Sequence, residues 1–278
     1  MATDLRTVQG CMLDITLEIQ RICEKHGLTF FLAYGTLLGA VRHQGFIPWD
    51  DDMDVGMPRA DYEKFLQIAP QELGEEFFLQ TADTDPAYAF TFAKVRLNGT
   101  TMLEDYAADS KQHNGIYVDI FPYETCPDGG LQRKLHFLLF KCVKWAALGK
   151  TDYKFIIPKR RRFAKLMSAV LFFLRKDGAI KFANKLRRMF ERRKTAYCVD
   201  PEWYKGIIAL EDIQSTVSLS FEGHSMPVPQ HYQELLTQIY GDYMQLPPVE
   251  ERGNKHQMVK MDTGDRVSGL EPATPYKG

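Results

Sequence analysis

The stretch IPWDDDMDVGM, residues 47–57, decides how this chain is expected to fold. It places four carboxylates within five positions, between apolar residues on both sides: Asp50, Asp51, Asp52 and Asp54. An acidic run in a solvated loop is common, but apolar flanks of this kind are typical of a strand. Because successive side chains of a strand point to opposite faces, Asp52 and Asp54 are expected to share a face, with Met53 between them in the core.

Two carboxylates on one face of a strand repel each other unless something positive lies between them. They are about 7 Å apart along the strand, and carboxylate oxygens are ligands that Mg²⁺ prefers, usually together with substrate phosphates. By the same alternation, Asp50 joins Asp52 and Asp54 as a metal ligand, whereas Asp51 faces away. The stretch therefore predicts a site for Mg²⁺ or Mn²⁺ at the edge of a strand.

A third acid lies far along the chain in another strand-like run, GIYVDIFP, residues 115–122. A lone buried aspartate such as Asp119 is costly unless it is paired or bound to a metal. If this strand lies beside residues 52–57, Asp119 becomes a further metal ligand and a candidate for the general base that takes the acceptor's proton. The catalytic set expected from these residues is Asp52, Asp54 and Asp119.

A phosphate-binding turn is expected upstream, where a strand at 28–35 gives way to a helix at 36–44. Gly35 and Thr36 lie at this turn, and backbone amides at the start of a helix can hold a phosphate. Glycine with Ser or Thr, then an alternating acid pair, then a third acid is the order found in nucleotidyltransferases. Each piece alone is weak, and the combination favours this class of enzyme.

Periodicity along the rest of the chain predicts an α+β protein. Helices are expected at residues 4–26, 36–44, 59–69, 130–148, 158–197 and 231–244, strands at 28–35, 53–57, 76–81, 89–97 and 115–122, and a strand pair or turn at 218–230. This order indicates an α/β or α+β unit with one mixed sheet flanked by helices and with an additional mainly helical region, and the glycine turn with its acids favours a nucleotidyltransferase-like version of it. The expected domains are a catalytic core at 1–128, a basic helical insertion at 129–200, a segment at 201–261 that completes the catalytic domain, and a flexible tail at 262–278.

Composition limits the class of protein. The 278 residues are 45% hydrophobic with a formal net charge of −1, which is ordinary for a soluble globular chain. The N-terminus lacks the pattern of a signal peptide and no apolar run reaches roughly 18 residues, so a cytoplasmic protein is expected. The five cysteines form no CxxC pair, which favours reduced thiols over a zinc site or a disulfide framework.

Basic residues are concentrated in one segment. Residues 154–194 hold fifteen Lys and Arg against two acids, Asp177 and Glu191, while the rest of the chain is acidic. These can be solvated charges on exposed helices, or they can rest with neighbouring Phe and Leu on an anionic membrane surface as a peripheral contact. Because no nucleic-acid-binding motif accompanies the charge, a nucleic-acid partner is not expected.

The stretch YGTLLGAVRHQGFIPWDDDMDVGMPRADYEKF, residues 34–65, closely resembles the LicD family of phosphotransferases, which includes the fukutin-related proteins. Residues 94–96, 115–122 and 221–256 extend the resemblance over most of the chain. It implies a nucleotidyltransferase-like fold that moves a phosphodiester-linked group from a CDP-activated donor to a hydroxyl group. By the match of motif, the acidic metal-site roles fall to Asp50, Asp52, Asp54 and Asp119.

LicD-type enzymes are associated with phosphocholine transfer from CDP-choline to cell-surface glycans, and fukutin-related proteins with ribitol phosphate. The resemblance therefore implies Mg²⁺-dependent transfer of phosphocholine to a glycan, such as lipopolysaccharide or teichoic acid, or to its lipid-linked precursor. Transfer of ribitol, glycerol or ethanolamine phosphate stays open, as do nucleotidyl transfer to a sugar or small molecule and a non-catalytic binding protein. The cysteine cluster that binds zinc in some fukutin-related proteins has no counterpart here, which argues against ribitol.

Further site residues are expected from their positions. Basic side chains for the donor phosphates are Arg42, which follows the Gly35-Thr36 turn, and Lys94 and Arg96, which share one face of a strand. Aromatic rings hold a choline cation at roughly 0.5–2 kcal/mol each, and the candidates are Trp49, Tyr106, Tyr117, Tyr123 and Trp203. The C-terminal run that resembles the family adds Arg252 and His256.

Overall fold

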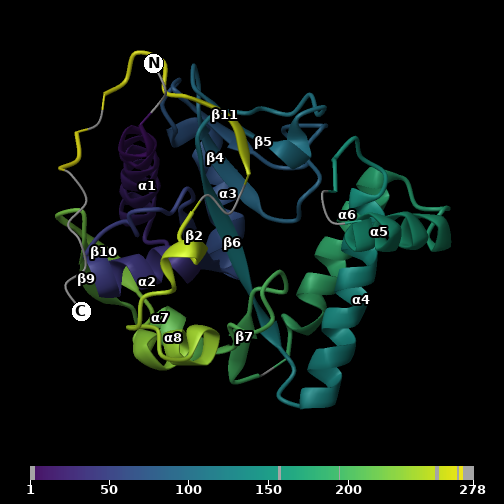
Figure 1. Ribbon diagram of the computed structural model, residues 1–278. Helices are drawn as coiled ribbons and strands as arrows, with labels where there is room; N and C mark the ends of the chain where they lie inside the picture. The colour runs from purple at the N-terminus through teal and green to yellow at the C-terminus, as the bar shows by residue number, and fades with distance from the viewer. Residues whose placement is uncertain (1–3, 156–157, 194, 254–256, 268, 272–278) are drawn as a thin grey trace.

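The structure is a computed structural model that describes residues 4–155, 158–193, 195–253, 257–267 and 269–271. Its centre is a mixed sheet of seven strands: β1 (Phe31–Leu32), β2 (Asp54–Pro58), β3 (Phe77–Gln80), β4 (Ala93–Leu97), β6 (Tyr117–Cys126), β7 (Tyr197–Val199) and β8 (Ile208–Ala209). Five strands lie in the order β1-β2-β6-β4-β3, while β7 pairs with the second half of β6 and carries β8 (Figure 1). β2 and β6 run parallel and the other neighbours antiparallel. The expected α+β fold with a mixed sheet is confirmed.

Three helices from the first part of the chain pack against this sheet: α1 (Leu5–His26), α2 (Tyr34–His43) and α3 (Arg59–Glu72). α1 buries an apolar stripe with spacings of three and four: Val8, Met12, Ile15, Ile19 and Ile22. It ends at Gly27, whose φ of 63° is the left-handed conformation that favours glycine. Asp4 occupies the N-cap position but makes no side-chain capping hydrogen bond.

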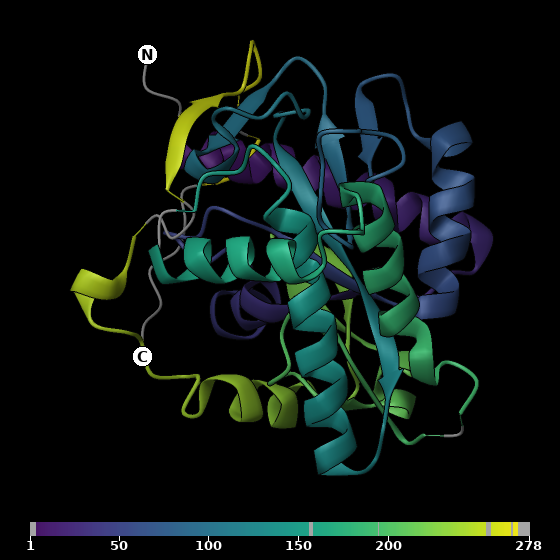
Figure 2. The same cartoon turned by 90° about the vertical axis from the view of Figure 1, so that its right-hand side faces the viewer.

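The additional helical region consists of α4 (Gly130–Leu148), α5 (Pro158–Val170), α6 (Lys176–Arg187) and the short η2 (Arg188–Phe190). α4 packs against both α5 and α6, and the three helices lie together on one side of the molecule, facing the viewer in Figure 2. The predicted helix at 158–197 is therefore two helices, and the chain returns to the sheet at β7. The division into domains at residues 128, 200 and 261 stays a prediction.

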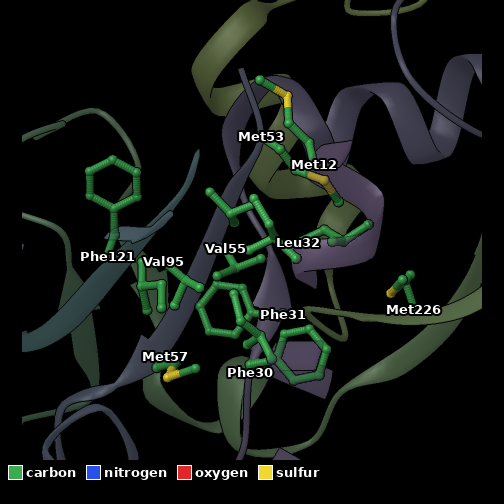
Figure 3. Close-up of a cluster of buried hydrophobic side chains, with 14 of the residues drawn as sticks. Met12, Phe30, Phe31, Leu32, Met53, Val55, Met57, Val95, Phe121 and Met226 are labelled. Atoms are coloured by element: carbon green, nitrogen blue, oxygen red, sulfur yellow. The ribbon is translucent and has the colours of Figure 1, made fainter. Parts of the chain in front are cut away.

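The middle of the sheet is buried on both faces. Residues 54–57 of β2 and 117–124 of β6 are all buried, which is typical of parallel strands. Side chains from β2 and its neighbours gather in one apolar cluster that includes Met12, Phe31, Leu32, Met53 and Val55 (Figure 3). Each fully buried side chain of this size stabilises the fold by about 1.5–3 kcal/mol. This cluster fixes the start of β2, where the acidic residues lie.

Several elements differ from the sequence prediction. The buried run at 28–35 forms only the two-residue strand β1, and α2 begins at Tyr34, two residues earlier than expected. Residues 89–92 are a loop before β4, in which Phe90 and Phe92 are apolar because they pack on other rings. Short apolar runs carry too little periodicity to separate a strand from a buried loop.

Two strand pairs lie outside the central sheet. β9 (Val217–Phe221) and β10 (His224–Val228) form the pair predicted at 218–230. β5 (Thr101–Glu104) pairs with the C-terminal β11 (Met258–Asp262), a long-range contact that the sequence did not predict (Figure 1). Asp262, the first residue of the predicted flexible tail, pairs with Thr101, and residues 268 and 272–278 lie outside the described residues.

The remaining elements are short. They are η1 (Asp105–Ala107), α7 (Leu210–Gln214), α8 (Tyr232–Tyr240) and η3 (Val249–Glu251). The predicted helix at 231–244 corresponds to α8.

All five cysteines are free thiols, as expected. Within the described residues, no helix is both long and apolar enough to cross a membrane.

A buried ion network fixes the helical region to the sheet. Arg187, in the last turn of α6, is fully buried and donates to Glu124 Oε1 at 3.0 Å, to Asp200 Oδ1 at 2.8 Å and to the carbonyl oxygen of Pro122 at 3.0 Å. Glu124, on β6, also pairs with Arg59 of α3. Burial opposes ionisation of Glu124, but the two arginines outweigh it and lower its pKa. Two helices from distant parts of the chain therefore depend on one buried carboxylate.

Glu124→Gln is expected to lower the free energy of unfolding near neutral pH by about 3–5 kcal/mol, because both arginines stay buried without their shared anion. Ionised Glu124 stabilises the folded state above the pKa of its unfolded form, near 4.5. That contribution is lost as the pH falls toward the lower folded pKa. Urea denaturation should therefore show a large difference between wild type and variant near neutral pH and a smaller one at about pH 4.

Glu191→Gln is the control, since it removes an exposed pair with Arg188 in the same region. It should cost at most about 1 kcal/mol. Equal losses in the two variants, or a difference for Glu124→Gln that grows in acid, would contradict the assignment of the buried network.

Candidate active site

A cavity of about 760 Å³ lies beside β2 and β6. Its walls come from the start of α2, the loop before β2, strand β6, the segment at 200–203 and the C-terminal segment at 240–251. The acidic residues predicted for the metal site all line it: Asp50, Asp52, Asp54 and Asp119. Because segments far apart in the sequence meet around these carboxylates, this cavity is the candidate active site.

The register of the sheet brings Asp54 and Asp119 together. Asp54 is the first residue of β2 and Asp119 the third of β6, and the parallel pairing places them opposite each other. The Asp54 backbone N–H donates to Thr36 Oγ1 at 2.8 Å, and that of Asp119 donates to the Met53 carbonyl at 3.0 Å. The condition set for Asp119, that its strand lies beside residues 52–57, is met.

Asp50, Asp52 and Asp54 line the cavity and Asp51 does not, as the alternation predicts, although residues 50–53 precede β2 and have no strand pairing. The prediction did not include the closeness of Asp51 to its two neighbours. Asp51 is 2% exposed, and a carboxylate oxygen of it lies within 4.8 Å of oxygens of Asp50 and Asp52. It is not among the described residues that line the cavity. These three carboxylates form one group of oxygen donors, which is the chemistry that hard divalent cations require.

Lys94 supplies positive charge next to Asp119. Its Nζ lies 2.7 Å from Asp119 Oδ1, and the ammonium sits 3.4 Å from the centroid of the Tyr117 ring. Burial raises the pKa of Asp119, and Lys94 offsets part of that rise. Lys94 is only 3% exposed and lies beneath the cavity wall formed by the described residues. Its predicted contact with a donor phosphate stays a prediction.

Gly35 and Thr36 hold the acids in place. A Cβ atom at Gly35 would lie 2.9 Å from Asp50 Oδ2, so a glycine allows the carboxylate to approach the start of α2. Thr36 is buried, and its hydroxyl accepts the hydrogen bond from the Asp54 backbone. Gly35 lines the cavity, whereas Thr36 acts from inside the protein. Binding of phosphate at this turn stays a prediction.

The two predicted arginines have different surroundings. Arg42 lines the cavity, is 7% exposed, and donates from Nη1 to the Tyr243 carbonyl at 3.0 Å, so it ties the C-terminal segment to α2. Arg96 is 1% exposed and donates to Gln80 Oε1 at 2.5 Å and to the Gly115 carbonyl at 2.6 Å. The expected contact between Arg96 and a donor phosphate is corrected, because the Arg96 guanidinium is buried, bonded to these two groups, and not among the described residues that line the cavity.

Trp49 and Trp203 are the two predicted choline-binding residues that line the cavity. The Trp203 side chain is 47% exposed, and its ring centroid lies 6.0 Å from that of Tyr34. Trp49 is partly buried, with the Arg252 guanidinium 5.1 Å from its ring. Both rings can therefore reach a ligand in the cavity.

The other three predicted rings pack in the interior. Tyr106 contacts Tyr153, Tyr117 lies under Lys94, and Tyr123 packs edge-on against Phe31. None of the three is among the described residues that line the cavity. Adjacency to the acidic motifs in the sequence did not separate rings that face the cavity from rings that fill the core.

The C-terminal candidates lie partly outside the described residues. Arg252 donates from Nε to the Pro247 carbonyl at 2.8 Å and lies over Trp49, while Pro247 and Glu251 line the cavity. Arg252 therefore supports the cavity wall. His256 lies outside the described residues.

A second part of the cavity wall was not predicted. Tyr34 has its ring 5.4 Å from Phe121 and 6.0 Å from Trp203, and its hydroxyl donates to Asp200 Oδ2 at 2.8 Å. Its φ of 47° is strained for a bulky residue, and such strain is concentrated at functional sites. Burial and the nearby Asp200 carboxylate raise the pKa of Tyr34, so its hydroxyl stays protonated and donates. Glu202 lines the same wall.

The sequence signal for this wall is the run Asp200-Pro201-Glu202-Trp203, which sets two acids beside a tryptophan. Three rings, those of Tyr34, Phe121 and Trp203, thus lie next to two carboxylates. Rings and carboxylates together suit an organic cation. Tyr240 and Tyr243, also missed, line the cavity from the C-terminal segment.

A mixed sheet that carries acids on two adjacent parallel strands, with a glycine turn before them, defines a nucleotidyltransferase-like domain. Comparison with known proteins agrees, since residues 27–138 match the family described as LicD/FKTN/FKRP, nucleotidyltransferase domain. The chain is 31% identical over 265 residues to the lipopolysaccharide cholinephosphotransferase LicD of Haemophilus influenzae, covering 91% of this chain and 96% of that protein. The chain therefore belongs to the LicD family and is a transferase of that family.

Other relatives match smaller parts of the chain. The ribitol 5-phosphate transferase FKRP of mouse is 27% identical over 133 residues, 46% of this chain and 24% of that protein. An uncharacterised protein of Rickettsia typhi is 46% identical over 60 residues, 22% of this chain and 19% of that protein.

Gly35→Ala is expected to weaken binding of a divalent cation roughly 10–100-fold, the range found when a group that orients metal ligands is altered. The new Cβ would displace the Asp50 carboxylate, whose Oδ2 lies 2.9 Å from its position. Isothermal titration with Mg²⁺ and with Mn²⁺ measures the change. Gly74→Ala is the matched control, because its nearest neighbour would be 3.8 Å away. Unchanged affinity in Gly35→Ala would show that Asp50 does not hold the cation.

Proposed function

We propose that this LicD-family transferase moves phosphocholine from CDP-choline to a hydroxyl group of a glycan or of its lipid-linked precursor. The observation that carries the proposal is the make-up of one cavity. Carboxylates suited to a metal and to phosphate chemistry lie on one part of its wall, and rings with carboxylates suited to an organic cation lie on another. The similarity to a lipopolysaccharide cholinephosphotransferase over nearly its whole length supports the same donor.

The proposed cofactor is Mg²⁺, held by the acidic group before β2. Oxygens of Asp50, Asp51 and Asp52 lie within 4.8 Å of one another, and Asp54 follows directly at the start of β2. An all-oxygen donor set favours a hard cation over a soft one. When bound, Mg²⁺ would neutralise the negative charge of the donor pyrophosphate.

Asp119 is the proposed general base. Burial raises its pKa, which suits a carboxylate that must take a proton near neutral pH. The acceptor hydroxyl would give its proton to Asp119 while its oxygen bonds to the phosphorus of phosphocholine. The bond from that phosphorus to the oxygen of CMP breaks, and CMP leaves. Lys94 Nζ pairs with Asp119 Oδ1 at 2.7 Å and keeps the carboxylate in place.

The wall made by Tyr34, Phe121 and Trp203 is proposed to hold the trimethylammonium group. Such a cation has no hydrogen to donate, so it is bound by ring faces and by charge. Asp200 and Glu202 line the same wall, but they pair with Arg187 and Lys144, so the ring faces carry the proposed recognition of the cation. A polyol such as ribitol carries no cation, so the ring faces of this wall would contribute less to binding it than to binding choline.

A CDP-donor screen tests the proposal. Wild type is expected to release CMP with CDP-choline and an acceptor glycan, and to release less with CDP-ethanolamine, CDP-ribitol or CDP-glycerol. Asp52→Asn and Asp54→Asn should each lower the rate by roughly 100-fold or more, since the metal contribution is worth several kcal/mol. Both variants should keep the wild-type circular dichroism spectrum and melting behaviour.

Asp83→Asn is the control for the loss of a carboxylate, because Asp83 is exposed and lies away from the cavity. Pyrophosphate release in place of CMP would show nucleotidyl transfer. Preferred release from CDP-ribitol would assign the ribitol reaction of the FKRP relatives, and no metal-dependent release from any donor would indicate a binding protein.

Trp203→Leu separates recognition of choline from the chemistry. Loss of one ring face should raise the KM for CDP-choline roughly 2–30-fold, which corresponds to about 0.5–2 kcal/mol. The KM for CDP-glycerol, which carries no cation, should change little. Tyr197→Leu is the control, an equally exposed ring away from the cavity. An equal rise in the KM for both donors would show that Trp203 does not recognise the choline cation.

A further inference from the structure

The outer surface of the helical region exposes an unusual set of apolar side chains. Eight large hydrophobic residues between positions 131 and 173 are 52–80% exposed, and they include Leu131, Leu135, Leu138 and Leu139 of α4 and Phe172 and Phe173 after α5. In the rest of the described chain, only three large hydrophobics are more than half exposed. A concentration of this kind marks an interaction surface.

α4 is apolar on two sides. Phe140, Val143 and Ala147 are buried and face the neighbouring helices and the core. Leu131, Leu135 and Leu138 recur at spacings of four and three, so they form a second stripe along the same helix. A helix that only covers a core is polar on its outer side. The leucine stripe therefore has a purpose other than packing the helical region.

The same surface is strongly cationic. α4 and α5 together carry nine Lys and Arg and no acid. The side chains from Lys159 to Arg162 and Lys165 are exposed, and no described residue forms an ion pair with them. Exposed apolar side chains among unpaired cations are the pattern of a surface that lies on an anionic bilayer.

A groove between α4 and α5 adds depth to this surface. Its volume is about 430 Å³, and its lining includes the partly buried rings of Trp145 and Phe163 and the exposed cations of Lys159 and Arg160. Partly buried rings together with exposed cations match a phospholipid, whose phosphate would pair with the cations and whose apolar part would contact the rings. Glu202 lines both this groove and the active-site cavity, so the two are neighbours.

We propose that the outer surface of α4 and α5, with the turn that follows α5, docks on a bilayer that contains anionic phospholipid. A second copy of the chain fits poorly, because self-association through this face would bring the exposed cations of α5 in one copy against those of the other. Nucleic acid would pair with the cations but leave the leucines and phenylalanines in water. A bilayer with anionic headgroups satisfies both the charge and the apolar side chains.

Docking would bring the active-site cavity near the lipid surface, because Glu202 lines both the cavity and the groove between α4 and α5. An acceptor glycan on a lipid carrier in the same bilayer would then reach the cavity, a step that rests on the proposed function. The docking itself does not depend on that function.

Vesicle sedimentation of the full chain tests the docking. Vesicles of neutral phosphatidylcholine with added phosphatidylglycerol should bind the protein, vesicles of phosphatidylcholine alone should bind it much less, and added salt should release it. The double variants Leu135→Asp/Leu139→Asp and Lys159→Glu/Arg160→Glu should each weaken binding roughly tenfold or more. Val267→Asp and Lys111→Glu, which change exposed residues elsewhere, should bind as wild type does.

Mg²⁺ binding measured in each variant verifies that the cavity is still folded. Asp54→Asn should bind vesicles as wild type does, so that failure of the proposed function and failure of the docking are distinguishable. The docking is overturned if wild type ignores the anionic lipid or if the double variants bind unchanged. It is likewise overturned if Leu135→Asp/Leu139→Asp converts a dimer to a monomer in light scattering, or if a short RNA binds this face more tightly than vesicles.

Discussion

Parallel pairing of β2 with β6 sets Asp54 opposite Asp119 in the middle of a sheet that is buried on both faces. Two carboxylates in that position are unfavourable unless the surroundings compensate them. Lys94 pairs with Asp119, Thr36 accepts the hydrogen bond from the Asp54 backbone, and the cavity opens beside both. The turn into α2, the loop before β2 and the cavity are thus arranged around one pair of opposed acids.

A second buried network couples the helical region to the same cavity. Arg187 joins α6 to Glu124 of β6 and to Asp200, and Asp200 in turn accepts a hydrogen bond from Tyr34. Tyr34 is held at a strained φ of 47° with its ring on the cavity wall. The interaction that docks the helices is therefore also the one that positions an aromatic wall of the site. A change in the helical region can reach the cavity through three hydrogen-bonded side chains.

Local sequence was sufficient for the acidic part of the site. The acids, the glycine turn and the third aspartate follow from strand patterning and from resemblance, and the register confirms that Asp54 and Asp119 meet. Alternation placed Asp51 outside the cavity correctly, but it did not show that the loop before β2 brings the Asp51 carboxylate close to those of Asp50 and Asp52. The alternation of side chains along a strand also did not predict that Arg96 is buried and hydrogen-bonded to Gln80 and to the Gly115 carbonyl.

The sequence by itself determined the class of fold, the family and the carboxylates, since these depend on residues within one short stretch and on the periodicity of a strand. Only the tertiary structure decided which rings face the cavity. Tyr34 and Asp200 are 166 positions apart and are joined by one hydrogen bond. The C-terminal strand β11 pairs with β5, which is also far away in the sequence. Contacts of this kind form only when long loops of the chain close. The spacing of residues along the sequence does not show which distant segments meet when the loops close.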